Sequence, residues 1–138
     1  MYLEDISVGQ TATIERIVTQ EVINGFADVS HDHNPVHVDP EFAKTTDFEG
    51  VIAHGMLSAA YISAVLGTQL PGSGAIYMGQ TLRFRAPVRP GDKVVTTVAV
   101  KEIIAEKKRV ILDTVCTVGD TVVLEGEATT MVRMKPAA

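Results

Sequence analysis

Residues 55–66 have the sequence GMLSAAYISAVL, in which apolar side chains occur on nearly every face of a helix. A helix of this kind is normally surrounded by protein, because water would otherwise contact its hydrophobic side chains. The longer apolar stretch, residues 51–66, is interrupted by His54 and falls short of the ~20 apolar residues that a membrane-spanning helix needs. We therefore expect a central helix that is enclosed by the rest of the chain.

The C-terminal half of the chain predicts what encloses this helix. Four segments rich in Val, Ile and Thr favour β-strands: residues 75–84, 93–104, 109–118 and 121–134. Short connections join the last three, so consecutive strands must run antiparallel. The sequence therefore predicts an α+β architecture in which an antiparallel sheet wraps a central apolar helix.

The N-terminal half contains one predicted strand and two predicted helices. Residues 11–18 favour a strand. Thr19 is a good N-cap for a helix whose apolar residues recur at helical spacing as far as His31. Asp39, followed by proline, favours the start of a second, short helix. The first of these helices ends just before Asp32.

Size and charge limit the classes to which the protein can belong. The 138 residues predict one domain, residues 1–138, and 46% hydrophobic with 21% charged residues is typical of a globular protein. The net charge of -5 argues against nucleic acid or an anionic membrane as partner, since both attract basic surfaces. Residues 1–5 lack the basic-then-apolar pattern of a secretory signal.

The single cysteine, Cys116, lies in an apolar, β-branched run. We expect it to be a small buried side chain rather than a nucleophile. A chain with one cysteine has no internal disulfide, which fits a reducing compartment. Together with the absence of a predicted signal or membrane helix, this favours a cytoplasmic location.

Residues 31–39, HDHNPVHVD, contain three of the four histidines of the chain. Asn34 and the proline after it predict a bend, across which Asp32 and His37 face one another. A carboxylate and an imidazole that share a water molecule can move its protons without a metal. The alternative is that Asp32 ends a helix and His37 is a surface histidine. We expect the Asn34 amide to fix the bend by bonding to nearby backbone.

A second candidate group precedes the central helix. Gly55 follows His54 where that helix is predicted to begin, and a helix N-terminus presents unpaired N–H groups. The Gly55 N–H is therefore a candidate oxyanion donor to a thioester carbonyl. Alternatively, Gly55 only permits close packing of the helix on the sheet.

The histidine-rich segment also offers residues for a candidate metal site. His31, His33 and His37, with Asp32 or Asp39, offer ligands that suit zinc. Their spacing does not match a known zinc motif, so we expect no metal, and we expect His31 and His33 to be exposed.

Four segments together resemble the MaoC-like (R)-specific enoyl-CoA hydratases: DHNPVH at 32–37, AHGM at 53–56, YMGQ at 77–80 and FRAPVRPGD at 84–92. The resemblance implies a hot-dog fold, usually as a homodimer whose sheets join edge to edge. It implies reversible syn addition of water to a trans-2-enoyl-CoA, giving an (R)-3-hydroxyacyl-CoA. It requires no cofactor beyond the coenzyme A of the substrate.

The resemblance also implies roles for individual residues. Asp32 and His37 become the catalytic pair, and Gly55 becomes the donor to the thioester oxygen. Asn34 is placed among the substrate-binding residues, beside its role in the bend, and Ser63 takes a position similar to an active-site serine of the family. The expected wall of the acyl site comprises Ala59, Ala60, Ser63 and Leu66. Candidate ligands of the coenzyme A phosphates are Arg83, Arg85, Arg89 and Lys93, whose alternative role is that of solvated strand charges.

Two other functions stay open at this point, because a fold does not settle its chemistry. One is a hot-dog acyl-CoA thioesterase, and the other is a non-catalytic acyl-CoA-binding subunit. The sequence also leaves open the acyl chain length, the choice between coenzyme A and acyl carrier protein, and the pathway. The (R)-3-hydroxyacyl product suits polyhydroxyalkanoate synthesis, β-oxidation or fatty-acid synthesis.

Overall fold

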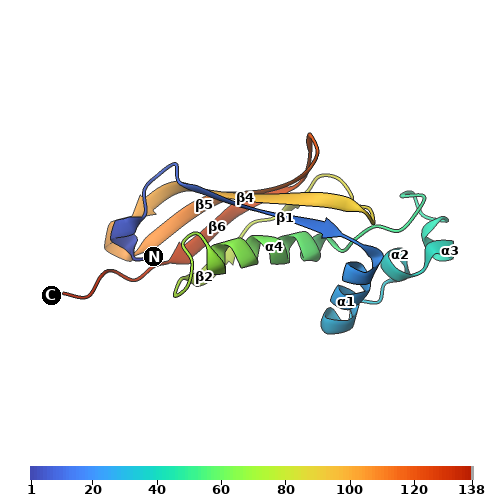
Figure 1. Cartoon of the computed structure of the whole chain (residues 1–138), viewed down its shortest axis with the longest axis horizontal. Helices are drawn as coiled ribbons and strands as arrows, with labels where there is room; N and C mark the ends of the chain where they lie inside the picture. Colours follow the sequence, from blue (N-terminus) through green and yellow to red (C-terminus); the bar gives the residue numbers. More distant parts are fainter. Residues whose placement is uncertain (138) are drawn as a thin grey trace.

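A computed structural model of the chain, describing residues 1–137, contains one six-stranded antiparallel sheet with a long helix along one face (Figure 1). The helix is α4, Gly55–Thr68. The strand order is β1-β4-β5-β6-β2, and β3 also pairs with β6. The strands are β1 Thr11–Val18, β2 Ile76–Gln80, β3 Arg83–Phe84, β4 Asp92–Ile104, β5 Arg109–Val118 and β6 Thr121–Met131. The predicted α+β architecture is confirmed.

The single strand predicted over residues 75–84 is wrong, because two strands, β2 and β3, occupy this segment. Between them, Thr81 donates its N–H to Glu127 O at 2.9 Å and leaves the regular ladder. The Thr81 carbonyl turns toward Gly126 of β6, where a Cβ atom would overlap it. The break thus depends on a glycine on a neighbouring strand, which the local sequence does not reveal.

Three short helices lie together at one end of the molecule, beyond the start of α4 (Figure 1). They are α1 Gln20–Ser30, α2 Pro35–Val38 and α3 Pro40–Ala43; short 3-10 helices cover Leu3–Asp5 and Ala105–Lys107. The Thr19 hydroxyl accepts a hydrogen bond from Val22 N at 3.1 Å, and Asp39 caps α3, as predicted. The predicted bend after Asn34 is itself one helical turn, α2, which the sequence did not predict.

The core lies between α4 and the concave face of the sheet. Ile62 and Val65 of α4 are fully buried, as are Val98 of β4 and Leu112 of β5. Cys116 of β5 is also fully buried, and burial raises the pKa of its thiol. The prediction that Cys116 is a small core side chain is confirmed.

The opposite face of α4 is not covered by the chain, so the expectation of a fully enclosed helix is wrong for a single copy (Figure 1). Its exposed residues are mostly small: Ala60, Ser63, Ala64 and Gly67, with Met56 at the N-terminal end. The helix is apolar on this face too, and within residues 1–137 no helix or strand covers it.

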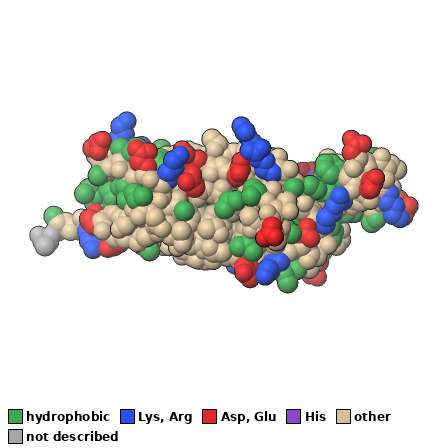
Figure 2. Space-filling view, turned by 90° about the horizontal axis from the view of Figure 1, so that it is seen from above, with side chains coloured by type: hydrophobic (Ala, Val, Ile, Leu, Met, Phe, Trp, Pro, Cys, Tyr) green, Lys and Arg blue, Asp and Glu red, His purple; other side chains and the backbone are tan. Residues whose placement is uncertain are grey.

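The outer face of the sheet carries acidic and basic side chains interspersed (Figure 2). Arg85 pairs with Glu125 at 2.5 Å, and Lys101 pairs with Glu127 at 2.7 Å. This surface presents no continuous basic area of the kind that binds nucleic acid. Within residues 1–137, no helix has the length and apolar character that crossing a membrane requires.

Replacing Ile62 with alanine tests the packing of α4. Because the side chain is fully buried against the sheet, Ile62→Ala is expected to lower the free energy of unfolding by about 2–5 kcal/mol. Ile17 of β1 is 60% exposed, so Ile17→Ala is the matched control, with an expected loss of about 1 kcal/mol or less. Urea denaturation followed by circular dichroism measures the free energy of unfolding of both variants. If the two variants lost the same amount, Ile62 would not be buried, which would contradict the orientation of α4.

Candidate active site

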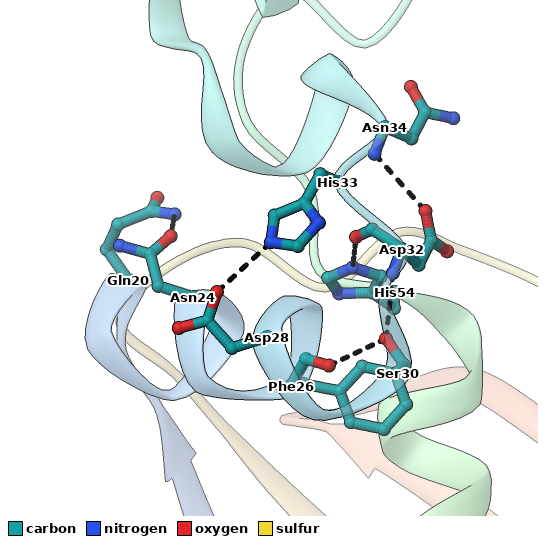
Figure 3. Close-up of polar contacts among 9 residues, drawn as sticks. All are labelled: Gln20, Asn24, Phe26, Asp28, Ser30, Asp32, His33, Asn34 and His54. Atoms are coloured by element: carbon teal, nitrogen blue, oxygen red, sulfur yellow. Dashed lines mark hydrogen bonds and ion pairs between the residues drawn. The ribbon is translucent and has the colours of Figure 1, made fainter.

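Asp32 is held by the turn that follows α1. The Ser30 hydroxyl donates to Phe26 O at 2.6 Å and accepts from Asp32 N at 3.2 Å, which ties the turn to the helix (Figure 3). The Asp32 carboxylate accepts from Asn34 N at 3.2 Å. The residue is exposed, so this carboxylate is fixed by backbone and remains open to a ligand.

His37 is buried on α2, with 8% of its surface exposed. Its Nδ1 lies 2.7 Å from Ile52 O, and because a carbonyl only accepts, Nδ1 carries the proton. In the neutral ring the lone pair is therefore on Nε2. The Gln20 side chain of α1 donates to His37 O at 3.0 Å and holds α2 in place. His37 thus presents Nε2 as its basic nitrogen.

His54 contacts both Asp32 and His37. Its Nε2 lies 2.9 Å from Asp32 O (Figure 3). Its ring also stacks on that of His37, with ring centroids 3.9 Å apart. Ligand-type atoms of Asp32, His37 and His54 all lie within 4.8 Å of one another. The prediction that Asp32 and His37 face one another agrees with this grouping. The sequence analysis included His54 in the AHGM segment before the central helix but gave it no role of its own, although a histidine directly before a buried helix was a usable signal.

Gly55 is the first residue of α4. Within the described part of the chain, its N–H donates to no protein acceptor. The Phe84 ring of β3 lies over the residue, and a Cβ at position 55 would overlap it, with 2.7 Å to Phe84 Cδ1. Gly55 therefore permits close packing and also presents a free donor, so both interpretations of this glycine fit the geometry.

A cleft of about 440 Å³ opens beside Gly55. This volume lies within the range of small-molecule sites. Its walls are largely apolar: Phe48, Ile52, Met56, Phe84, Pro87 and Val88. His54 and Gly55 line the cleft, and Arg85 contributes a cation. Asp32 and His37 are not among the residues that line the cleft, but both group with His54, which does line it.

Asn34 and Ser63 lie in different surroundings. The Asn34 side chain accepts from Val36 N at 3.3 Å, as expected for a residue that fixes the bend. Ser63 is exposed on the outer face of α4, with Ala60. Ala59 and Leu66 are buried in the core. The structure does not bring Ser63 or these three apolar residues into the cleft, and their role in an acyl site stays a prediction.

The remaining histidines do not join the cluster. His31 ends α1 with a φ of 63°, and His33 pairs with Asp28 of α1 at 3.0 Å. Figure 3 shows the His33 ring pointing toward α1. Both are exposed, as predicted. The metal-binding alternative with His31 and His33 is therefore wrong, and the group that has the geometry for a metal is Asp32, His37 and His54.

The four candidate ligands of the coenzyme A phosphates do not gather at one place. Arg85 pairs with Glu125, and Lys93 lies 3.6 Å from Glu15. Of the four candidates, only Arg85 lines the cleft among the described residues. Arg83 and Arg89 keep their predicted role without a structural argument for it.

The chain is similar to known proteins over most of its length. A family model described as MaoC like domain matches residues 6–124. The chain is 55% identical over 131 residues to an (R)-specific enoyl-CoA hydratase of Rhodospirillum rubrum, which covers 95% of this chain and 91% of that protein. It is 49% identical over 138 residues to a 3-hydroxybutyryl-CoA dehydratase of Methylorubrum extorquens, covering 100% of this chain and 88% of that protein.

Solved structures give the same result. An (R)-hydratase from A. caviae, described as involved in PHA biosynthesis, has a TM-score of 0.90 and 41% identity, covering 94% of this chain and 98% of that chain. The sheet wrapped along one helix is thus the hot-dog fold that the sequence resemblance implied. The fold, the segments at 32–37 and 53–56 and the matched family model lead to one assignment. The chain belongs to the MaoC-like family.

Proposed function

We propose that this protein is an (R)-specific enoyl-CoA hydratase, a hydro-lyase that adds water reversibly to a trans-2-enoyl-CoA. The observation that supports it most is the grouping of Asp32 and His37 with His54, the residue directly before the free N–H of Gly55. Relatives of 55% and 49% identity are named as a hydratase and a dehydratase of this kind. An (R)-3-hydroxyacyl-CoA product suits supply of a polyhydroxyalkanoate precursor.

The geometry suggests how the residues divide the reaction. The Asp32 carboxylate and His37 Nε2 accept hydrogen bonds from one water molecule, whose oxygen attacks C3 of the enoyl group. One O–H bond of this water breaks as its oxygen bonds to C3, and the Asp32–His37 pair passes that proton to C2, so the hydroxyl and the hydrogen arrive from one face. The Ile52 carbonyl holds His37 Nδ1–H throughout, which stabilises the ring when Nε2 is protonated.

Negative charge develops on the thioester oxygen as water adds. The Gly55 N–H, at the positive end of α4, would donate to that oxygen and stabilise the enolate-like transition state. The apolar cleft beside Gly55 would hold the thioester and exclude water, which strengthens this hydrogen bond.

Acid–base groups alone account for this chemistry, so we propose that neither a metal nor a cofactor takes part. Asp32, His37 and His54 have the geometry for a metal, which makes a chelator a necessary control. We also keep the sequence-based expectation of a cytoplasmic location as part of the proposal.

The purified protein is expected to remove the conjugated enoyl absorbance of crotonyl-CoA and of a medium-chain trans-2-enoyl-CoA. A thiol reagent in a parallel cuvette should detect no release of coenzyme A, and prior treatment with a chelator should not change the rate. Thiol release with intact enoyl absorbance would select a thioesterase. Binding without either change would select a non-catalytic subunit.

Two variants test the catalytic pair in the same assay. Asp32→Asn and His37→Gln each remove one proton-transfer group and are expected to lower the hydration rate by about 10²–10⁴. Circular dichroism should show an unchanged fold, at least for Asp32, which is exposed. A variant that keeps the full rate would remove its residue from the proposed mechanism.

The role of the Gly55 N–H can be isolated with proline. Proline suits the first position of a helix, and His54, with φ -61° and ψ 133°, already has the backbone conformation that precedes proline. Phe84→Ala first removes the ring that would collide with a larger residue at 55. In that background, Gly55→Pro is expected to hydrate about 10²–10³ more slowly than Gly55→Ala, because only proline lacks the donor. Equal rates would leave Gly55 with a packing role alone.

We further propose that two copies pair along β2. This strand forms one edge of the sheet, and its exposed side chains include Ile76 and Met78, 55% and 48% exposed. An unpaired edge of this kind is a template for another strand. The outer face of α4, with Met56 at 54% exposure, offers the second copy further apolar surface.

A charge on this edge tests the pairing. Light scattering is expected to give a dimer mass for the wild type and a monomer mass for Ile76→Lys, because pairing would bury the added charge. Val29→Lys is the control, since Val29 is 78% exposed on α1, away from β2. A dimer that persists in Ile76→Lys, or a monomeric wild type, would contradict pairing through β2.

A further inference from the structure

His54 differs from every other polar residue in the described chain. Its Nδ1 is the one buried side-chain nitrogen or oxygen within residues 1–137 that has no hydrogen-bond partner. The residue is 3% exposed and lies between two rings, those of Phe26 and His37. An unpartnered buried polar atom costs stability, so packing alone favours an apolar ring at this position.

The other ring nitrogen makes a specific contact. Nε2 donates to Asp32 O at 2.9 Å, across 22 positions of the sequence (Figure 3). That carbonyl belongs to the residue whose carboxylate is proposed to hold the water. An apolar ring would fill the same space and could not make this bond. The hydrogen bond is therefore what distinguishes histidine from phenylalanine here.

The two stacked histidines also adopt opposite tautomers. His37 donates through Nδ1 to Ile52 O, whereas His54 donates through Nε2 to Asp32 O. Each ring is thereby oriented by one backbone carbonyl. The centroid distance of 3.9 Å and the interplanar angle of 28° keep the His37 ring against His54. His54 contacts both members of the catalytic pair and precedes Gly55 in the chain.

We propose that His54 is a positioning residue for hydration, which fixes Asp32 through Nε2–H. The inference rests on the proposed hydratase function and extends it to a residue outside the reacting groups. The other contacts that hold the turn from Ser30 to Asn34 are the Ser30 hydroxyl, the hydrogen bond from Asn34 N to the Asp32 carboxylate, and the exposed pair of His33 with Asp28. None of them contacts the Asp32 carbonyl that His54 holds. Without the His54 bond, the carboxylate would sample positions from which it does not share a water molecule with His37.

Two substitutions separate the hydrogen bond from the ring. His54→Phe keeps an aromatic ring between Phe26 and His37 and removes the donor. His54→Gln removes the ring, but its side-chain amide extends about as far from the backbone as Nε2 does and can still donate to Asp32 O. Steady-state hydration of crotonyl-CoA gives kcat and KM for both variants, and circular dichroism gives their thermal stability.

We expect kcat of His54→Phe to fall about 10- to 100-fold with KM nearly unchanged, because a displaced carboxylate affects the reaction more than binding. His54→Gln is expected to recover most of kcat, although it loses the stack. The proposal is overturned if His54→Phe keeps the wild-type kcat, or if His54→Gln loses as much as His54→Phe. A purely structural role would lower thermal stability in both variants without this order in kcat.

A second measurement does not depend on activity. Nitrogen-15 NMR of the histidine side chains in the wild-type protein is expected to show His54 as the Nε2–H tautomer and His37 as the Nδ1–H tautomer. The His54 Nε2 proton should exchange slowly with water. A His54 ring with its proton on Nδ1 would overturn the inference even if hydration is fast. Absence of hydration with the expected tautomers would instead reject the proposed function.

Discussion

The packing of α4 against the concave face of the sheet is the interaction on which the rest of the structure depends. Ile62, Val65 and the β-strand residues opposite them exclude water from one continuous core. Because the helix begins at Gly55, this packing also fixes where its free N–H groups lie. The same helix therefore provides the core and one wall of the candidate site.

The candidate site is assembled by backbone carbonyl groups rather than by ion pairs. Ile52 O orients the His37 ring, and Asp32 O receives the His54 ring. These contacts place polar side chains at the end of an apolar core, where the loss of water strengthens hydrogen bonds. The result is an arrangement in which the fold sets which nitrogen of each ring carries the proton.

Local patterns predicted most elements and several of their ends. Thr19 and Asp39 cap helices as their side chains indicate, and Asn34 caps the turn before His37. The patterns failed where a distant residue decides the local conformation. The break between β2 and β3 depends on Gly126, which lies 45 positions from Thr81 in the sequence and directly beside it in the sheet.

The sequence by itself determined the antiparallel sheet around an apolar helix, the family, and the pairing of Asp32 with His37 as the place to seek chemistry. Periodicity, caps and a short motif are local, so they are visible along the chain. Only the tertiary structure decided that His54 belongs to this group and that one face of α4 stays uncovered. The place of His54 depends on contacts with His37 and Asp32, 17 and 22 positions away, and no local pattern encodes such contacts.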